Sequence, residues 1–134
     1  MSYTRETDDD DWAGTISILG QSYPFTLRAS YEPEELDAVA SRAKDFLESN
    51  WQRILDRLTA DLLPMKNDAW RDADEPLLTE ADILNALDDP DINVWEEETI
   101  MMVFSDGGLF GGHYIQVFIE SPERGRDISV GIIG

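Results

Sequence analysis

Hydrophobic and polar residues alternate near the start of the chain, and this alternation predicts a β-hairpin. Apolar side chains recur at every second position over residues 12–19 and again from Tyr23 to about Ala29. Each run has the two-residue period of a strand that buries one face. Gly20 and Gln21 separate the two runs and permit a turn. The first thirty residues are therefore predicted to form two paired strands.

A helical period follows the hairpin. Pro33 suits the first position of a helix, and acidic residues occupy the next two positions, where the helix dipole favours anions. Apolar residues then recur at spacings of three and four until Leu62, and no further proline occurs before Pro64. The pattern predicts one long helix over about residues 33–61. We expect residues 63–76 to form a connecting loop.

The second half of the chain predicts one short helix and four strands. Thr79, followed by Asp82 three residues later, resembles a capping arrangement for a helix that ends near Leu87. Period-two segments then predict strands joined by short turns over residues 92–95, 99–105, 113–120 and 127–133. The order β-β-α-α-β-β-β-β predicts an α+β domain, in which a mainly antiparallel sheet of about six strands packs against one long and one short helix.

Length and composition fit one folded domain preceded by an acidic segment. The chain has 134 residues, of which 42% are hydrophobic and 10% aromatic, as in globular proteins. Residues 1–11 are polar and acidic, so we expect a flexible N-terminal segment and a single domain over residues 12–134. The start lacks the basic and apolar regions of a signal peptide, and no apolar run is long enough to span a bilayer. These features predict a cytoplasmic protein.

Acidic side chains give the composition its main functional signal. The net charge is −19, and residues 72–123 contain 14 acidic side chains but no lysine or arginine. Such a charge repels phosphate backbones and anionic membranes, which argues against binding to nucleic acids or membranes. It is compatible with a basic protein partner. The alternative is a solvated surface that serves only solubility.

Four tryptophans lie in four different predicted elements, an arrangement typical of residues that share a core. We expect Trp12, Trp51 and Trp95 to pack there. Trp70 lies in the predicted loop. It either clamps the end of the long helix or presents an aromatic anchor to a partner.

A glycine-rich segment precedes the single histidine and supplies the main catalytic alternative. Its residues of interest are Asp106, Gly107, Gly108, Phe110, Gly111, Gly112 and His113. An aspartate beside a histidine is able to orient the ring for acid–base catalysis. In the structural interpretation, the glycines allow a tight loop that the histidine hydrogen-bonds in place. The segment lacks the Lys-Ser/Thr pair of a phosphate-binding loop, and neither a second histidine nor a cysteine completes a metal site, so no cofactor or metal is predicted.

Several segments resemble one bacterial family. They are Leu62-Leu63-Pro64-Met65-Lys66-Asn67-Asp68-Ala69-Trp70, Leu78-Thr79 at the short helix, residues 106–115, and Ile132-Ile133-Gly134. Over about residues 12–134 the chain resembles the bacterial proteins of domain-of-unknown-function family 2262. The resemblance implies an uncharacterised, small acidic protein of immunity type, one that neutralises a co-encoded toxin. It implies no established activity and no cofactor.

Charge and resemblance together favour a non-enzymatic protein-binding module that neutralises a basic effector or toxin. An acidic patch would steer its association with the partner, and a buried aromatic side chain would anchor the complex. The steering candidates are Glu96, Glu97, Glu98, Asp88, Asp89 and Asp91, and the anchor candidates are Trp70 and Trp95. One alternative is a small enzyme or ligand-binding domain that uses the Asp106–His113 loop. Another is a housekeeping protein whose acidity serves solubility.

Overall fold

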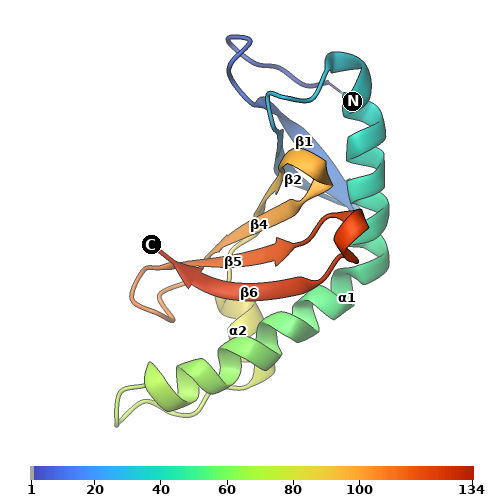
Figure 1. Ribbon diagram of the computed structural model, residues 1–134. Helices are drawn as coiled ribbons and strands as arrows, with labels where there is room; N and C mark the ends of the chain where they lie inside the picture. The colour runs from blue at the N-terminus through green and yellow to red at the C-terminus, as the bar shows by residue number, and fades with distance from the viewer. Residues whose placement is uncertain (1) are drawn as a thin grey trace.

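The predicted strands form one sheet in sequence order, as the computed structural model of residues 2–134 describes it (Figure 1). Every neighbouring pair is antiparallel except the pair formed by the second and third strands. This confirms the predicted α+β class, the element order and the mainly antiparallel sheet. The strands are β1 (Trp12–Ile18), β2 (Gln21–Leu27), β3 (Asp91–Val94), β4 (Ile100–Ser105), β5 (Tyr114–Ile119) and β6 (Ile128–Ile133).

The parallel pair β2–β3 follows from the order of the elements. The chain leaves the sheet after β2 and returns at β3 only after both helices, and such a crossover allows two strands to run in the same direction. Phe25 lies opposite Ile92, and Leu27 lies opposite Val94. This register places the beginning of β2 beside the segment that enters β3.

The long helix α1 (Leu36–Ala69) packs along one side of the sheet (Figure 1). A 3-10 turn (Pro33–Glu35) precedes it. The helix has 34 residues and is therefore about 51 Å long at 1.5 Å per residue. It contacts the edge strands β1 and β6. Although α1 is long, neither it nor any other helix within residues 2–134 is both long and apolar enough to cross a bilayer.

The prediction of a loop over residues 63–76 is wrong for residues 63–69, which belong to α1. Pro64 lies inside the helix at an exposed position. Its missing N–H leaves the carbonyl of Ala60 without its helical partner, and both residues lie on the exposed side of the helix, where an unpaired backbone group costs less than in the core. Beyond the proline, the Asn67 side chain accepts from the N–H of Leu78 (2.9 Å) and donates to its carbonyl (3.1 Å). These bonds secure the last turns of the helix.

The short helix α2 (Glu80–Ala86) has the predicted capping box. The hydroxyl of Thr79 accepts from the backbone N–H of Asp82 (3.3 Å), and the Asp82 carboxylate accepts from the N–H of Thr79 (2.8 Å). Ile83 is fully buried, and α2 packs against α1. The cap therefore fixes where α2 begins, and the burial of Ile83 fixes the face that it turns to the core.

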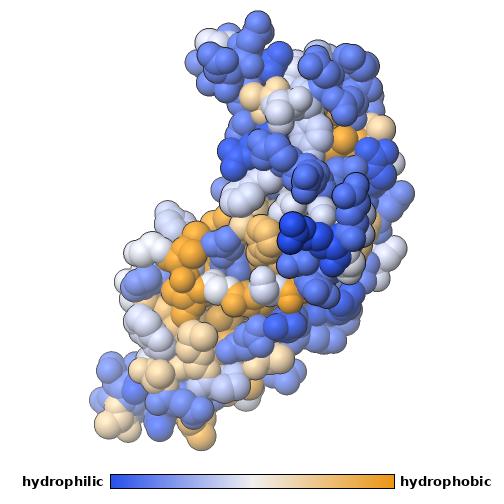
Figure 2. Space-filling model, viewed as in Figure 1, coloured by the Kyte–Doolittle hydropathy of each residue, from blue (hydrophilic) through white to orange (hydrophobic). Residues whose placement is uncertain are grey.

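The core lies between the sheet and α1 and consists of alternate strand residues and the apolar stripe of the helix. Figure 2 shows that hydrophilic residues cover most of one face of the molecule, whereas hydrophobic residues gather around β5 and β6.

None of the four tryptophans belongs to the fully buried core. The sequence predicts that three tryptophans pack in the core. Trp12 and Trp51 pack only against its border, and Trp95 is not among the residues that pack there.

The N-terminal segment makes contacts that the sequence did not indicate. Thr4 and Ala13 exchange two backbone hydrogen bonds of 2.8 and 2.9 Å. The guanidinium of Arg5 lies 3.9 Å from the centre of the Trp12 ring. Asp11 accepts a hydrogen bond from the backbone N–H of Ala29 (3.0 Å). An isolated bridge therefore joins Thr4 to the outer edge of β1, and residues 5–11 form the loop between the two bridged positions.

The Thr79 cap gives a direct test of how α2 is held. We expect Thr79→Ala to lower the free energy of unfolding by about 1 kcal/mol, because the N–H of Asp82 loses its acceptor. Thr79→Ser keeps the hydroxyl and is expected to retain most of that stability. Urea denaturation at pH 7 measures both variants. Equal destabilisation by serine and alanine would contradict a role for the hydroxyl.

Candidate functional site

The glycine-rich loop is organised by the carboxylate of Asp106, whose residue is only 2% exposed. One oxygen accepts from the N–H of Gly108 (2.8 Å), and the other accepts from those of Phe110 (2.9 Å), His113 (3.0 Å) and Gly112 (3.1 Å). Burial on its own raises the pKa of Asp106, but the four hydrogen bonds together outweigh it, so the net pKa is lowered. The carboxylate is therefore ionised at neutral pH.

The His113 ring is held by the loop itself. Its Nδ1–H donates to the carbonyl of Phe110 (2.5 Å), and its ring lies edge-on to Trp70 with 5.6 Å between centroids. Asp106 contacts the backbone of His113 and not its ring, so the Asp–His pairing considered for acid–base catalysis is not formed. The contacts of His113 match the structural interpretation of this residue.

Trp70 caps the end of α1 and lies against the same loop. Its ring is edge-on to that of the fully buried Phe110, with 5.6 Å between centroids. Lys66 donates to the carbonyl of Trp70 (2.7 Å), which holds the residue at the helix end. These are the contacts that the clamp interpretation expects. Trp70 nevertheless remains 40% exposed, which leaves part of the ring for a partner.

The glycines of the loop differ in what surrounds them. Gly107, Gly108, Gly111 and Gly112 all have positive φ angles. A Cβ added to Gly107 would lie 1.9 Å from the carbonyl oxygen of Ala86, whereas one added to Gly108 would meet nothing within 4 Å. Only the absence of a side chain at Gly107 lets the loop pack directly on the end of α2.

Of the predicted steering residues, Glu96 and Glu98 are already paired. Glu98 accepts from Nε of Arg42 at 2.7 Å, and Glu96 lies 3.8 Å from Nε of Arg28. Their turn follows β3 and contains positive φ angles at Glu97 and Glu98. The field of this cluster is therefore partly neutralised within the chain.

Trp95 is fixed beside the same turn. The Tyr31 hydroxyl donates to its carbonyl (2.5 Å) and accepts from the N–H of Glu98 (2.9 Å). The Arg28 guanidinium lies 4.8 Å from the Trp95 ring centre, and Phe118 packs edge-on against it. The ring is therefore partly covered by the chain itself and less available as an anchor than Trp70.

The aspartates of the predicted patch lie at the opposite end of β3. Asp91 and Glu96 are five residues apart, which corresponds to about 17 Å of extended strand. The six predicted steering residues therefore form two groups and not one patch. None of the ion pairs within residues 2–134 involves Asp88, Asp89 or Asp91.

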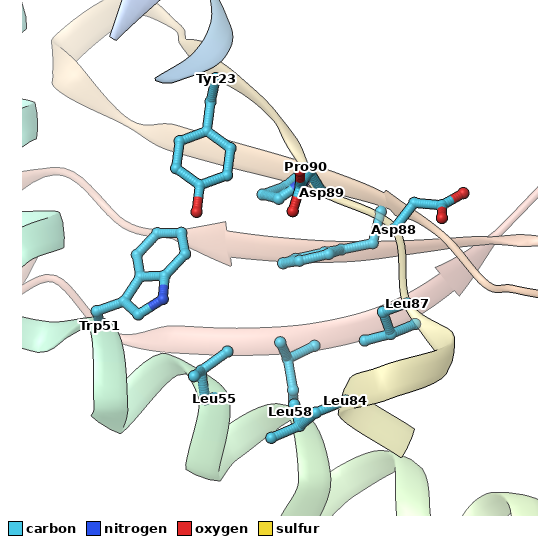
Figure 3. A pocket seen from close by; sticks show the side chains of 10 residues that line it. Tyr23, Trp51, Leu55, Leu58, Leu84, Leu87, Asp88, Asp89 and Pro90 are labelled. Carbon is cyan, nitrogen blue, oxygen red and sulfur yellow. The ribbon is translucent and has the colours of Figure 1, made fainter. Parts of the chain in front are cut away.

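A pocket of about 190 Å³ opens beside these aspartates (Figure 3). Residues of β2, α1, α2, β4 and the segment before β3 line it. They are Tyr23, Trp51, Leu55, Leu58, Leu84, Leu87, Asp88, Asp89, Pro90 and Phe104. Two carboxylates and a phenol thus share the lining of this cavity with apolar side chains. We call it the Tyr23 pocket.

The polar groups of the Tyr23 pocket lie opposite its leucines. In Figure 3 the Tyr23 hydroxyl points into the cavity toward Trp51, while the leucines lie on the other side. The rings of Tyr23 and Trp51 are 5.5 Å apart. Burial raises the pKa of Tyr23 above its usual value, and the negative charge of Asp89 raises it further. The phenol therefore keeps its proton at neutral pH. Gln21 donates from its amide to Asp89 (2.8 Å).

Sequence reasoning missed this pocket. The sequence predicts Trp51 as a core residue and Tyr23 only as a strand residue. Their meeting with Asp89 depends on the β2–β3 register, which no local pattern reveals. Within residues 2–134, no group of three or more histidine, aspartate or glutamate side chains is placed to hold a metal ion.

Comparison with known proteins places the chain in one family. The family model described as "Uncharacterized protein conserved in bacteria (DUF2262)" matches residues 3–127, so the chain belongs to this family. No curated protein and no solved structure matches it.

The buried carboxylate of Asp106 predicts a pH-dependent contribution to stability. Because folding lowers its pKa, this contribution is present above the unfolded value near 3.9 and is lost as the pH falls through the folded value. We expect Asp106→Asn to lower the free energy of unfolding at pH 7 by about 2 kcal/mol. The amide NH₂ cannot accept a hydrogen bond, so it leaves one backbone N–H of the loop without an acceptor. The difference from wild type should shrink below about pH 4.

Urea denaturation across pH measures this difference, and Asp68→Asn on the exposed side of α1 is the matched control. A deficit in Asp106→Asn that is equal at pH 7 and pH 3 would contradict the contribution of the charge.

The contact of Gly107 with α2 predicts unequal effects of two similar substitutions. Alanine at either Gly107 or Gly108 adopts a positive φ, which costs about 1 kcal/mol. Gly107→Ala must also displace the backbone of Ala86, so we expect it to lower the free energy of unfolding by about 1–3 kcal/mol more than Gly108→Ala. Thermal and urea unfolding measure the difference. Equal effects would contradict the close packing of the loop on α2.

Proposed function

We propose that this DUF2262 protein is a cytoplasmic, non-enzymatic binding module of immunity type, which neutralises a basic effector or toxin by binding it. The observation that carries the proposal is the group of carboxylates before and at the start of β3. Asp88, Asp89 and Asp91 are free of ion pairs within residues 2–134, in a chain with a net charge of −19.

Unpaired carboxylates act on a partner from a distance. Their field raises the rate at which an oppositely charged protein meets this surface, and salt screens the field over about 10 Å at 0.1 M. Glu96 and Glu98 contribute less, because the fields of Arg42 and Arg28 oppose theirs. The aspartates before and at the start of β3 are therefore the main steering residues of the proposed complex.

Residence time in such a complex depends on contacts that exclude water. Aromatic side chains are enriched among residues that carry binding energy. Trp70 is partly exposed at the end of α1, so it supplies an aromatic surface that is already held in place by Phe110 and His113. We propose that it contributes to the contact.

A capture experiment tests the proposal. The tagged protein is isolated from its native host at low and at high salt, and mass spectrometry identifies what accompanies it. We expect one stoichiometric basic protein whose recovery falls as salt rises. Absence of such a protein at both salt concentrations would contradict the proposal.

Association kinetics with the captured partner provide a sharper prediction. Asp88→Asn/Asp89→Asn/Asp91→Asn and Glu96→Gln/Glu97→Gln/Glu98→Gln each remove three negative charges. We expect the aspartate variant to slow association about three- to tenfold at low salt and the glutamate variant to slow it less. Stopped-flow rates at several salt concentrations measure both effects. An unchanged rate and salt dependence in the aspartate variant would exclude this group as the steering surface.

A further inference from the structure

The Tyr23 hydroxyl is a polar group that the Tyr23 pocket leaves without a protein partner. No hydrogen bond within residues 2–134 involves its hydroxyl, which reaches solvent although the residue as a whole is only 6% exposed. In Figure 3 this hydroxyl points into the cavity. A phenol both donates and accepts hydrogen bonds, so the group is available to a molecule that enters.

Charge along one side of the pocket selects the kind of molecule. The Asp89 carboxylate lies close enough to Tyr23 to raise the pKa of the phenol, and Gln21 holds that carboxylate in position. Asp88 adds a second negative charge to the lining, although its carboxylate points away from the cavity in Figure 3. An anion is therefore repelled from the pocket and a cation is attracted to it.

The walls and the volume select the shape of that cation. Leu55, Leu84 and Leu87 offer an aliphatic wall, and the Trp51 indole supplies an aromatic surface of the kind that attracts cations. The volume of about 190 Å³ is below the roughly 300–1,000 Å³ of sites that hold whole small ligands. It exceeds the roughly 150 Å³ cavity that holds a benzene molecule. A single long side chain fits this range.

We propose that the Tyr23 pocket receives a lysine side chain of the basic partner, with its methylene groups against the leucines and its ammonium group at Tyr23 and Asp89. This inference rests on the proposed function for the identity of the partner. The chemistry of the pocket itself requires only an ammonium group on an alkyl chain.

The n-butylammonium ion represents the lysine side chain and tests the pocket directly. The ¹⁵N-labelled protein is titrated at constant pH and ionic strength, and the indole N–H signal of Trp51 is followed by NMR after its assignment with Trp51→Phe. We expect a saturable shift of this signal. 1-Butanol and butyrate have the same chain length but carry no positive charge, and we expect both to bind at least tenfold more weakly. Binding of 1-butanol as tight as that of butylammonium, or no saturable binding of the cation, would overturn the proposal.

Two variants locate the binding within the pocket. Asp89→Asn keeps an oxygen for Gln21 but removes the charge, and Tyr23→Phe removes only the hydroxyl. We expect at least a fivefold loss of butylammonium affinity in the first and at least a twofold loss in the second. Glu123→Gln removes the same charge from the exposed turn before β6 and should change the affinity less than twofold. Equal effects of Asp89→Asn and Glu123→Gln would contradict a specific contact.

The two proposals fail in different ways. If butylammonium does not bind selectively but the triple aspartate variant still slows association with a captured basic protein, the lysine pocket is excluded and the proposed function is supported. If butylammonium binds selectively but no basic protein is captured, the ammonium site is supported and the proposed function is excluded.

Discussion

The Asp106 carboxylate is buried among backbone N–H groups, and the loop curls around it because only those groups satisfy its charge. The curl gives Gly107 a positive φ and presses it against the carbonyl of Ala86, the last residue of α2. The end of α2 in turn determines where residues 87–89 reach the Tyr23 pocket. A charge-assisted network outside the pocket therefore supports one side of its rim.

The fold separates acidic residues that are close together in sequence. β3 and the residue after it are extended, so Asp91 and Glu96, which are five residues apart, lie about 17 Å from each other. At one end, Arg28 and Arg42 pair with Glu96 and Glu98, and the backbone of the turn is bonded to further side chains. At the other end, no cation within residues 2–134 pairs with the aspartates. A uniform acidic run in the sequence thus becomes one compensated and one uncompensated surface.

The elements that the sequence predicted correctly are those with local causes. The hairpin, the later strands and the Thr79 cap depend on side-chain alternation or on residues three apart, and all are present. The predicted end of α1 is too early because Pro64 and Ala60 lie on the exposed side of the helix, where the loss of one backbone hydrogen bond costs less than in the core. The Tyr23 pocket depends on residues 68 positions apart, Gln21 and Asp89, which a parallel strand pair brings together. No pattern within a short window predicts such a meeting.

Glu98 and Asp89 are both held by a side chain of the same protein, but the two partners differ in charge. Glu98 is held by the guanidinium of Arg42, so its position is fixed and its charge is partly neutralised. Asp89 is held by the neutral amide of Gln21, which fixes its position but leaves its charge in full. Unneutralised like charges repel one another in the folded chain, and a cation from outside removes that repulsion when it binds. The free energy of the proposed complex would therefore include the relief of a repulsion that the free protein retains.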